Sequence, residues 1–338
     1  MSVRAVAVFG AGKRVLETAL PAFAKLPASF WIHSVWGRTP RIVEAAGLRH
    51  EVRRFETITH KDLEGVDLVY LCVAKDAVPR VLARLTELEP YNRDLLIDTP
   101  VVRFKHFRHA AKARAFRETW VAEDCVELPW MQAALAAVGP LHRVEFDRSA
   151  YAYHGIATAR ALFAARTIPS ARRLALPGGL HERTLRFTHN RVARIVEPRD
   201  YQAGRLVFVG QGGSLSDAPR PGEACLALTP ELTDGAVTAI AAGDVRLPLD
   251  AAESELTVGD PSGASLTARQ DAMKRVGFLR LLRRIVAGKG GHSLELGLED
   301  MVVDYFLEKL GRWHSSPLTT PRSLFARGLY SVLTLPSR

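Results

Sequence analysis

Apolar runs of strand length alternate with helix-like segments over the first hundred residues. Residues 3–9, 67–73 and 95–97 are such runs, and the first of them ends at a glycine-containing turn. Segments with apolar positions at helical spacing lie between them, one reaching Lys25 and one over residues 78–88. Strands that are apolar throughout are typical of a parallel sheet covered on both faces. The pattern predicts an N-terminal Rossmann unit, a doubly wound parallel sheet.

A further strand is expected over residues 31–36, ending at Gly37 and Arg38. Thr39 is a favourable helix N-cap, and Pro40 suits the first helical position. The sequence therefore predicts a helix after this strand.

Beyond about residue 120, short strand patterns separated by Gly and Asp turns replace the alternation. A helix over 156–165 interrupts them, two helices over 272–286 and 299–310 follow, and Gly178-Gly179 and Gly212-Gly213 are expected hairpin turns. The expected strands cover residues 143–146, 173–176, 184–187, 192–196, 205–209, 225–228 and 255–258. This predicts a C-terminal α+β domain with a mainly antiparallel open sheet. We therefore divide the chain into residues 1–120 and 121–338, with the last helices free to pack back on the first domain.

The composition is that of an ordinary globular protein. Of 338 residues, 47% are hydrophobic and 24% charged, which excludes a disordered or collagen-like chain. No apolar run reaches the roughly 18 residues of a membrane span, and the N-terminus lacks the pattern of a secretory signal. Three widely spaced cysteines do not form a disulfide framework. We expect a cytoplasmic protein with no membrane partner.

A formal net charge of +10 favours anionic partners: nucleic acid, an acidic lipid surface, or a phosphate-bearing ligand. The densest basic segment, residues 105–117, has alanine and phenylalanine at helical spacing, which is typical of a solvated helix face. It lacks a zinc-finger, RRM or helix-turn-helix signature, so we expect no nucleic-acid partner. The opposing hypothesis, nucleic-acid binding through this segment, predicts a steeply salt-dependent affinity.

A glycine fingerprint follows the first strand. Gly10 permits a tight turn, and Gly12 lets the backbone approach a pyrophosphate at the start of a helix. The third position of the fingerprint is Val15 rather than Gly or Ala. We expect dinucleotide binding here, with Lys13 and Arg14 on the same turn contacting the cofactor.

The residue at the end of the second strand selects the nucleotide. An acidic residue there binds the ribose of NAD, whereas this chain has Arg38 and Thr39, with Arg41 nearby. A guanidinium can hold a 2′-phosphate bidentately. The sequence therefore favours NADP(H) over NAD(H).

Four segments carry a family resemblance: GAGKRV at 10–15, WGRTP at 36–40, VDLVYLCVAKDAV at 66–78 and LLIDTP at 95–100. Over residues 3–102 the chain resembles the glucose–fructose oxidoreductase/inositol dehydrogenase family (Gfo/Idh/MocA). The resemblance implies an NAD(P)-binding Rossmann domain and a C-terminal domain on an open antiparallel sheet. That sheet often serves oligomerisation in the family, so we expect a homodimer or homotetramer through it.

The family's usual catalytic elements are a Glu-Lys-Pro after the fifth strand, and a His with a nearby Asp in the second domain. Here Asp98, Thr99 and Pro100 occupy the first position, so a threonine replaces the lysine. A hydroxyl can orient a substrate but is too weak an acid to replace an ammonium. In the segment that resembles the second element, His154 is retained and the aspartate position is Ala157.

These departures favour reduction over oxidation of a sugar alcohol. Biliverdin reductases and thiazolinyl imine reductases resemble this family, lack the lysine and reduce C=C or C=N bonds. We predict an NADPH-dependent reductase acting on a C=O, C=N or conjugated C=C bond of a small metabolite. The nicotinamide would lie near Ala74 and residues 98–100, His154 with Tyr151 or Tyr153 would return the proton, and Thr99 would orient the substrate.

The missing lysine and aspartate favour, as the alternative function, a catalytically impaired NADP-binding scaffold or sensor. No metal is expected, because no HExxH or paired Cys/His motif is present; Asp124 and Cys125 could line the cleft, Cys125 being more typical of a buried small residue.

Overall fold

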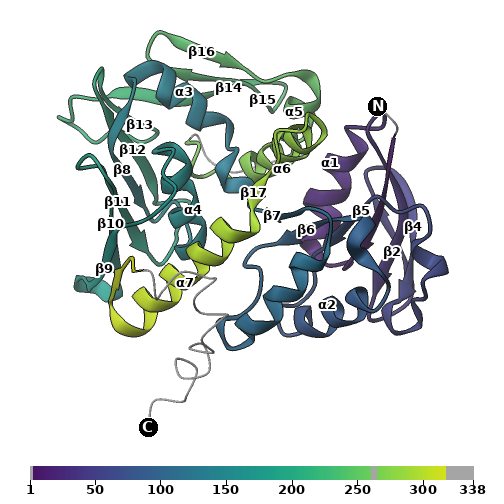
Figure 1. Ribbon diagram of the computed structural model, residues 1–338. Helices are drawn as coiled ribbons and strands as arrows, with labels where there is room; N and C mark the ends of the chain where they lie inside the picture. The colour runs from purple at the N-terminus through teal and green to yellow at the C-terminus, as the bar shows by residue number, and fades with distance from the viewer. Residues whose placement is uncertain (1–2, 260–264, 317–338) are drawn as a thin grey trace. The chain divides into compact units, whose positions relative to one another are not determined.

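The computed structural model describes residues 3–259 and 265–316, which form two compact units, each built around one β-sheet (Figure 1). Among these residues, the first unit contains 3–123 and 278–301. The second contains 124–259, 265–277 and 302–316. None of the described helices is both long and apolar enough to cross a bilayer.

The first unit contains an eight-stranded sheet with the order β17-β7-β6-β5-β1-β2-β4-β3. Its six inner strands run parallel, and β3 and β17 pair antiparallel at the two edges. The strands are β1 Arg4–Phe9, β2 Phe30–Gly37, β3 Arg41–Ala45, β4 Leu48–Arg54, β5 Leu68–Leu71, β6 Asp94–Asp98, β7 Thr119–Ala122 and β17 His292–Ser293. Every residue of β5 and β6 is buried, as the continuous apolar runs predicted. The doubly wound parallel sheet is confirmed.

Helices connect these strands. A π-helical turn, η1 (Val15–Ala19), leads into α1 (Leu20–Ala24), and α2 spans Val78–Thr86. Three short 3₁₀ turns are η2 (Phe55–Thr57), η3 (Lys61–Leu63) and η4 (Pro90–Asn92).

The basic segment forms a 3₁₀ helix, η5 (Phe104–Ala115), that packs against α2. Its buried residues recur every third position: Phe104, Phe107, Ala110 and Ala113. A 3₁₀ helix has three residues per turn, so this spacing places them all on one face. The expected solvated basic face therefore forms on a 3₁₀ helix.

The helix predicted after Thr39 is wrong. A β-hairpin of β3 and β4 stands there, closed by Ala46 (φ 53°) and Gly47 (φ 74°). Two consecutive residues with positive φ form the type of turn whose twist matches paired strands. The β-branched pair Ile42 and Val43 favours a strand over a helix, a local preference that opposes the cap signal.

The second unit contains a ten-stranded sheet with the order β16-β15-β14-β13-β12-β8-β11-β10-β9-β18. Its pairs are antiparallel except β8 with β11 and β13 with β14, so the mainly antiparallel sheet is confirmed. The strands are β8 Leu141–Asp147, β9 Ser170–Ala175, β10 His181–Arg186, β11 Val192–Glu197, β12 Arg205–Gly210, β13 Gly213–Ser216, β14 Leu226–Thr233, β15 Ala236–Ala242, β16 Val245–Pro248 and β18 Arg312–His314. Both predicted double-glycine turns lie in hairpins, between β9 and β10 and between β12 and β13.

The strand predicted over 255–258 is wrong. Helix α5 (Ala251–Glu255) ends there. Its N-cap is Asp250, whose side chain accepts a hydrogen bond from the Glu253 N–H at 3.0 Å. An acidic N-cap of this kind starts a helix, and the chain then turns. Four further strands of this sheet and one helix were not predicted: β13, β15, β16, β18 and α3 (Pro129–Val138).

Helices α3 and α4 (Ala152–Leu162) pack on the sheet of the second unit. Two short turns, η6 (Asp124–Val126) and η7 (Pro177–Gly179), and two long helices, α6 (Gln270–Val286) and α7 (Leu294–Leu310), complete the described elements. Charged side chains also project from the sheet strands: Arg194 bridges Glu145 at 2.8 Å and Glu182 at 2.5 Å. Self-association through this sheet stays a prediction.

Candidate functional site

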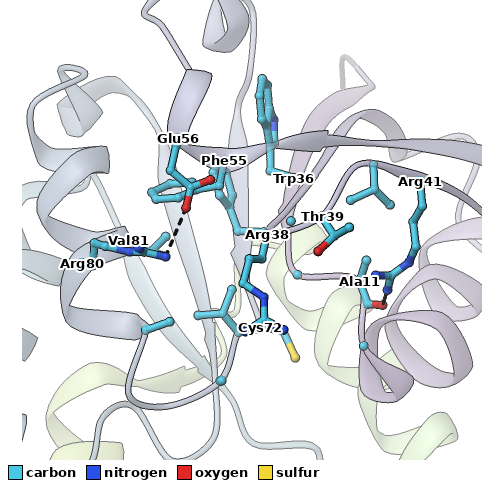
Figure 2. Close-up of a pocket in the computed structure, with 18 residues that line it drawn as sticks. Ala11, Trp36, Arg38, Thr39, Arg41, Phe55, Glu56, Cys72, Arg80 and Val81 are labelled. Carbon is cyan, nitrogen blue, oxygen red and sulfur yellow. Dashed lines mark hydrogen bonds and ion pairs between the residues drawn. The ribbon is translucent and has the colours of Figure 1, made fainter.

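A cavity of about 380 Å³ opens in the first unit where β1, β2 and β5 end (Figure 2). The carboxyl ends of parallel strands are where doubly wound sheets bind ligands, and the volume is within the range of small-molecule sites. It is lined by Phe9, Gly10, Ala11, Gly12, Trp36, Gly37, Arg38, Thr39, Arg41, Val52, Phe55, Glu56, Cys72, Val73, Ala74, Ala77, Arg80 and Val81. Gly10, Gly12, Arg38, Thr39 and Ala74, predicted from separate motifs, are thus brought together.

The two glycines of the turn differ in what surrounds them. At Gly10, φ is +123° and an added Cβ would lie 1.9 Å from the backbone oxygen of Cys72, so only glycine fits between β1 and β5. At Gly12, an added Cβ would meet no described atom within 4 Å outside its chain neighbours. Protein packing therefore does not require glycine at position 12, and the space above it is open to a ligand such as a pyrophosphate.

Three arginines line this cavity, and they differ in whether they contact another residue (Figure 2). Arg41 donates from Nη2 to the Ala11 carbonyl at 2.6 Å, and Arg80 pairs with Glu56 at 3.3 Å. Arg38 is exposed, and no carboxylate in the described ranges forms an ion pair with it. An unpaired guanidinium in a cavity is suited to an anionic ligand.

A second group of charges lies at the end of β6. The Asp98 carboxylate is 3.3 Å from Arg14 Nε and 3.5 Å from Lys75 Nζ, and Lys75 also donates to the Asp98 carbonyl at 2.9 Å. Burial raises the pKa of Asp98, but the charges of Lys75 and Arg14 outweigh it and hold that pKa below its usual value. An ionised carboxylate therefore fixes the Lys75 ammonium at this edge of the sheet.

Lys75 is a residue that the sequence analysis missed. It lies four residues after the end of β5, and residues that follow a buried parallel strand meet at the ligand edge, which is the signal that could have identified it. Thr99 follows Asp98 and is buried, and Pro100 follows a cis peptide bond.

Other predicted or basic residues lie away from the cavity. Lys13 is exposed, 3.7 Å from Glu17, and does not line it. Around the basic segment, Asp76 pairs with Arg103 at 2.9 Å and with Lys105 at 3.1 Å. These pairs neutralise part of the charge that motivated the nucleic-acid hypothesis.

In the second unit, His154 lies in the first turn of α4. Its N–H donates to the Tyr151 carbonyl at 2.7 Å, and its own carbonyl accepts from Thr158 Oγ1 at 2.7 Å. His154 and Tyr151 line a small cavity, whereas Tyr153 is 4% exposed with its ring against the edge of the His154 ring. Ala157 is fully buried, and as an alanine it supplies no carboxylate.

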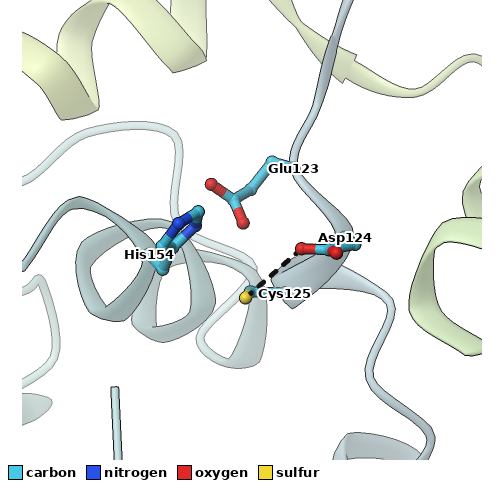
Figure 3. Close-up of side chains that lie close together, drawn as sticks. All are labelled: Glu123, Asp124, Cys125 and His154. Atoms are coloured by element: carbon cyan, nitrogen blue, oxygen red, sulfur yellow. Dashed lines mark hydrogen bonds between the residues drawn. The ribbon is translucent and has the colours of Figure 1, made fainter. Parts of the chain in front are cut away.

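Asp124, Cys125 and His154 lie close together, with Glu123 directly before them in the chain (Figure 3). Each of the four offers a ligand atom, and these atoms lie within 4.8 Å of one another. Burial lowers the pKa of Lys274, but neighbouring Cys125, Tyr201 and Asp124 outweigh it and raise that pKa overall. The Lys274 ammonium thus supplies positive charge beside potential metal ligands, and the expectation of no metal stays a prediction.

No protein-family model matches the chain, and no curated protein matches its sequence. Solved structures match in fold. An aldose–aldose oxidoreductase from Caulobacter crescentus complexed with glycerol has a TM-score of 0.58 at 15% identity, covering 93% of this chain and 100% of that chain. A scyllo-inositol dehydrogenase from Lactobacillus casei with bound NAD(H) and scyllo-inositol has a TM-score of 0.56 at 11% identity, covering 92% and 99%.

A third similar structure is GenD2 from gentamicin A biosynthesis in complex with NAD, with a TM-score of 0.57 at 14% identity over 94% of this chain and 97% of that chain. At such identities the likeness concerns the fold. It confirms the Gfo/Idh/MocA type of fold that the four sequence segments suggested.

Proposed function

We propose that the protein is an NADP(H)-dependent oxidoreductase that reduces a small metabolite. One observation carries the proposal: the open space at Gly12 and Arg38, which has no ion-pair partner among the described residues, line the same cavity at the ends of parallel strands. The similar structures, two of which contain NAD or NAD(H), support a nicotinamide cofactor and oxidoreductase chemistry. The bound cofactor would supply the hydride.

Different residues around the cavity would bind different parts of the cofactor. The backbone at Gly12 would approach the pyrophosphate, and Arg41 would hold the turn through its bond to Ala11. Arg38 and Thr39, at the end of β2, would receive the 2′-phosphate that distinguishes NADP from NAD. Glu56 forms an ion pair with Arg80, which reduces the repulsion between the Glu56 carboxylate and that phosphate.

Substrate handling would depend on a lysine other than the family's. Lys75, held by Asp98, would place an ammonium at the strand edge where the motif itself has Thr99. Thr99 would orient the substrate by hydrogen bonding. His154, with Tyr151, would return the proton; Tyr153 is 4% exposed and does not line the small cavity that these two residues share.

The alternative function is a scaffold or sensor that binds NADP without turnover, favoured by the lack of a carboxylate at Ala157 and of a lysine at Thr99. It predicts the same cofactor binding but no NADPH oxidation with any carbonyl, imine or enone substrate. Turnover with one such substrate would exclude it.

We expect NADPH to bind more tightly than NADH, and Arg38→Ala to weaken NADPH binding about tenfold while leaving NADH binding unchanged. A charge-assisted contact to a phosphate is worth about 1.5 kcal/mol, or one factor of ten. Trp36 lines the cavity, so quenching of intrinsic fluorescence reports the titration. Arg49→Ala, an exposed arginine that does not line the cavity, is the control. Equal affinity of the wild type for both nucleotides would refute the NADP preference, and no binding of either would refute the proposed function.

A further inference from the structure

Exposed arginines gather at one edge of the second unit's sheet, where β18 pairs with β9 and β9 pairs with β10 (Figure 1). Arg312 on β18 lies directly opposite Arg172 on β9, and Arg172 lies opposite Thr184 on β10. Since successive side chains of a strand point to opposite faces, Arg186, two residues after Thr184, is on the same face as these residues. All three arginines are exposed.

This is the face of the sheet that points away from the helices. Ala171 and Trp313, which directly follow or precede the arginines along β9 and β18, are buried. The Trp313 ring packs against Phe306 of α7, with 5.4 Å between the ring centres. The arginines alternate with these buried residues and therefore project from the opposite, solvent-exposed face.

The positive charge of these arginines is not neutralised by an ion pair. No carboxylate in the described ranges forms one with any of the three. Glu182, on the same face of β10, already accepts hydrogen bonds from the side chains of Arg194 and Thr184. Like charges directly opposite each other in a sheet are destabilising, as for Arg172 and Arg312. An anionic partner would relieve this repulsion.

Two exposed leucines border the arginines. Leu174 comes two residues after Arg172 on the same face of β9, and it is 44% exposed. Leu310, the last residue of α7, is 59% exposed. The Gly311 carbonyl accepts a hydrogen bond from the Arg173 N–H at 2.7 Å, which holds this turn against β9. The edge of the sheet thus combines unpaired guanidiniums with exposed apolar side chains.

The chain continues from this edge with more residues of the same two kinds. The Ser315 N–H still donates to the Pro169 carbonyl, just before β9, at 2.8 Å. Beyond the described part, the sequence of residues 317–338 contains three arginines, five leucines and neither Asp nor Glu. The segment that leaves the edge therefore adds positive charge and apolar side chains.

The apolar side chains favour lipid over nucleic acid as the anionic partner. Proteins that bind single-stranded nucleic acid stack its bases on aromatic rings, whereas the side chains that accompany the arginines here are leucines. Leucines enter the boundary between head groups and acyl chains, and arginines are attracted to anionic lipids.

We propose that this surface docks the protein on a membrane rich in anionic lipids. We call it the basic patch, formed by Arg172, Leu174, Arg186, Leu310 and Arg312. The arginines contact the negative head groups, and the leucines enter the interface between them. The basic patch belongs to the second unit and the cofactor cavity to the first, so docking does not depend on the proposed function. Docking of this kind revises the expectation of no membrane partner.

Co-sedimentation of the full chain with vesicles tests the basic patch. We expect binding to vesicles of equal parts phosphatidylserine and phosphatidylcholine, weakened by added salt, and no binding to phosphatidylcholine alone. Each arginine near such a surface contributes about a factor of five, so Arg172→Gln/Arg312→Gln should bind about 25-fold more weakly. Leu310→Ser should also bind more weakly. All the substituted residues are exposed, and thermal melts check that the variants fold.

The matched control is Arg49→Gln/Arg166→Gln, which removes the same charge from two exposed arginines outside the basic patch and should bind as the wild type does. No binding of the wild type to the anionic vesicles would overturn the proposal. An equal loss in the control would also overturn it, because binding would then follow net charge alone. Full vesicle binding by Leu310→Ser, with single-stranded DNA bound through Arg172 and Arg312, would assign the patch to nucleic acid instead.

Discussion

Gly12→Asp should weaken the binding of both NADPH and NADH at least 100-fold and leave the folded structure intact. Since an added Cβ meets no described atom within 4 Å outside its chain neighbours, the new side chain fits without strain. Its carboxylate would occupy the proposed position of the pyrophosphate, and two negative groups in contact repel each other strongly. A 100-fold loss corresponds to about 2.8 kcal/mol. Fluorescence titration of both nucleotides and a thermal melt measure the two quantities.

Gly12→Ala and Gly10→Ala separate charge from packing. Gly12→Ala adds a small neutral group and should bind both nucleotides more weakly than the wild type but more tightly than Gly12→Asp. Gly10→Ala should lower the melting temperature, because its Cβ would overlap the Cys72 carbonyl. Wild-type affinity in Gly12→Asp would place the cofactor elsewhere and remove the basis of the proposed function.

The first unit was largely predictable because its signals are local. The strands β1, β5 and β6 are continuous apolar runs, and the glycine turn follows β1 directly. The β3–β4 hairpin was not predicted, because Thr39 and Pro40 give a helix-start signal, whereas positive φ at Ala46 has no marker in the residue type. Local signals that disagree can be resolved only by the pairing of β4 with β2.

The site residues divide in the same way. Gly10, Gly12 and Arg38 belong to short motifs with fixed positions relative to strands, so the sequence identifies them. Lys75 and Asp98 are 23 residues apart, and Lys274 and Tyr201 are 73 apart. No periodicity connects such pairs, because their contacts depend on how strands and helices pack.

The second large expected effect is a loss of stability when the charge cluster at the end of β6 is broken. Asp98→Asn, which keeps the size of the side chain, should lower the free energy of unfolding by about 3 kcal/mol near neutral pH. The substitution leaves Arg14 and Lys75 facing each other without the anion between them, and removing one partner of a buried charge cluster typically costs this much. Urea unfolding of the wild type and of Asp98→Asn, followed by a signal from the first unit, measures the difference in free energy of unfolding.

The pH dependence of that difference identifies charge as its cause. The pKa of Asp98 in the folded protein is held below its usual value of 3.8, so the stabilisation is fully present above the unfolded carboxyl's pKa. It is lost as the pH falls through the lower, folded pKa. The difference in free energy of unfolding between wild type and Asp98→Asn should therefore be constant from about pH 7 to about pH 5 and shrink below about pH 4.

Asp76→Asn is the control. Asp76 is an exposed aspartate that also pairs with basic residues, and its substitution should change stability little because solvent screens these pairs. A gap for Asp98→Asn that does not change with pH would show that the effect comes from packing, and the ionised carboxylate that is proposed to hold Lys75 would lose its support.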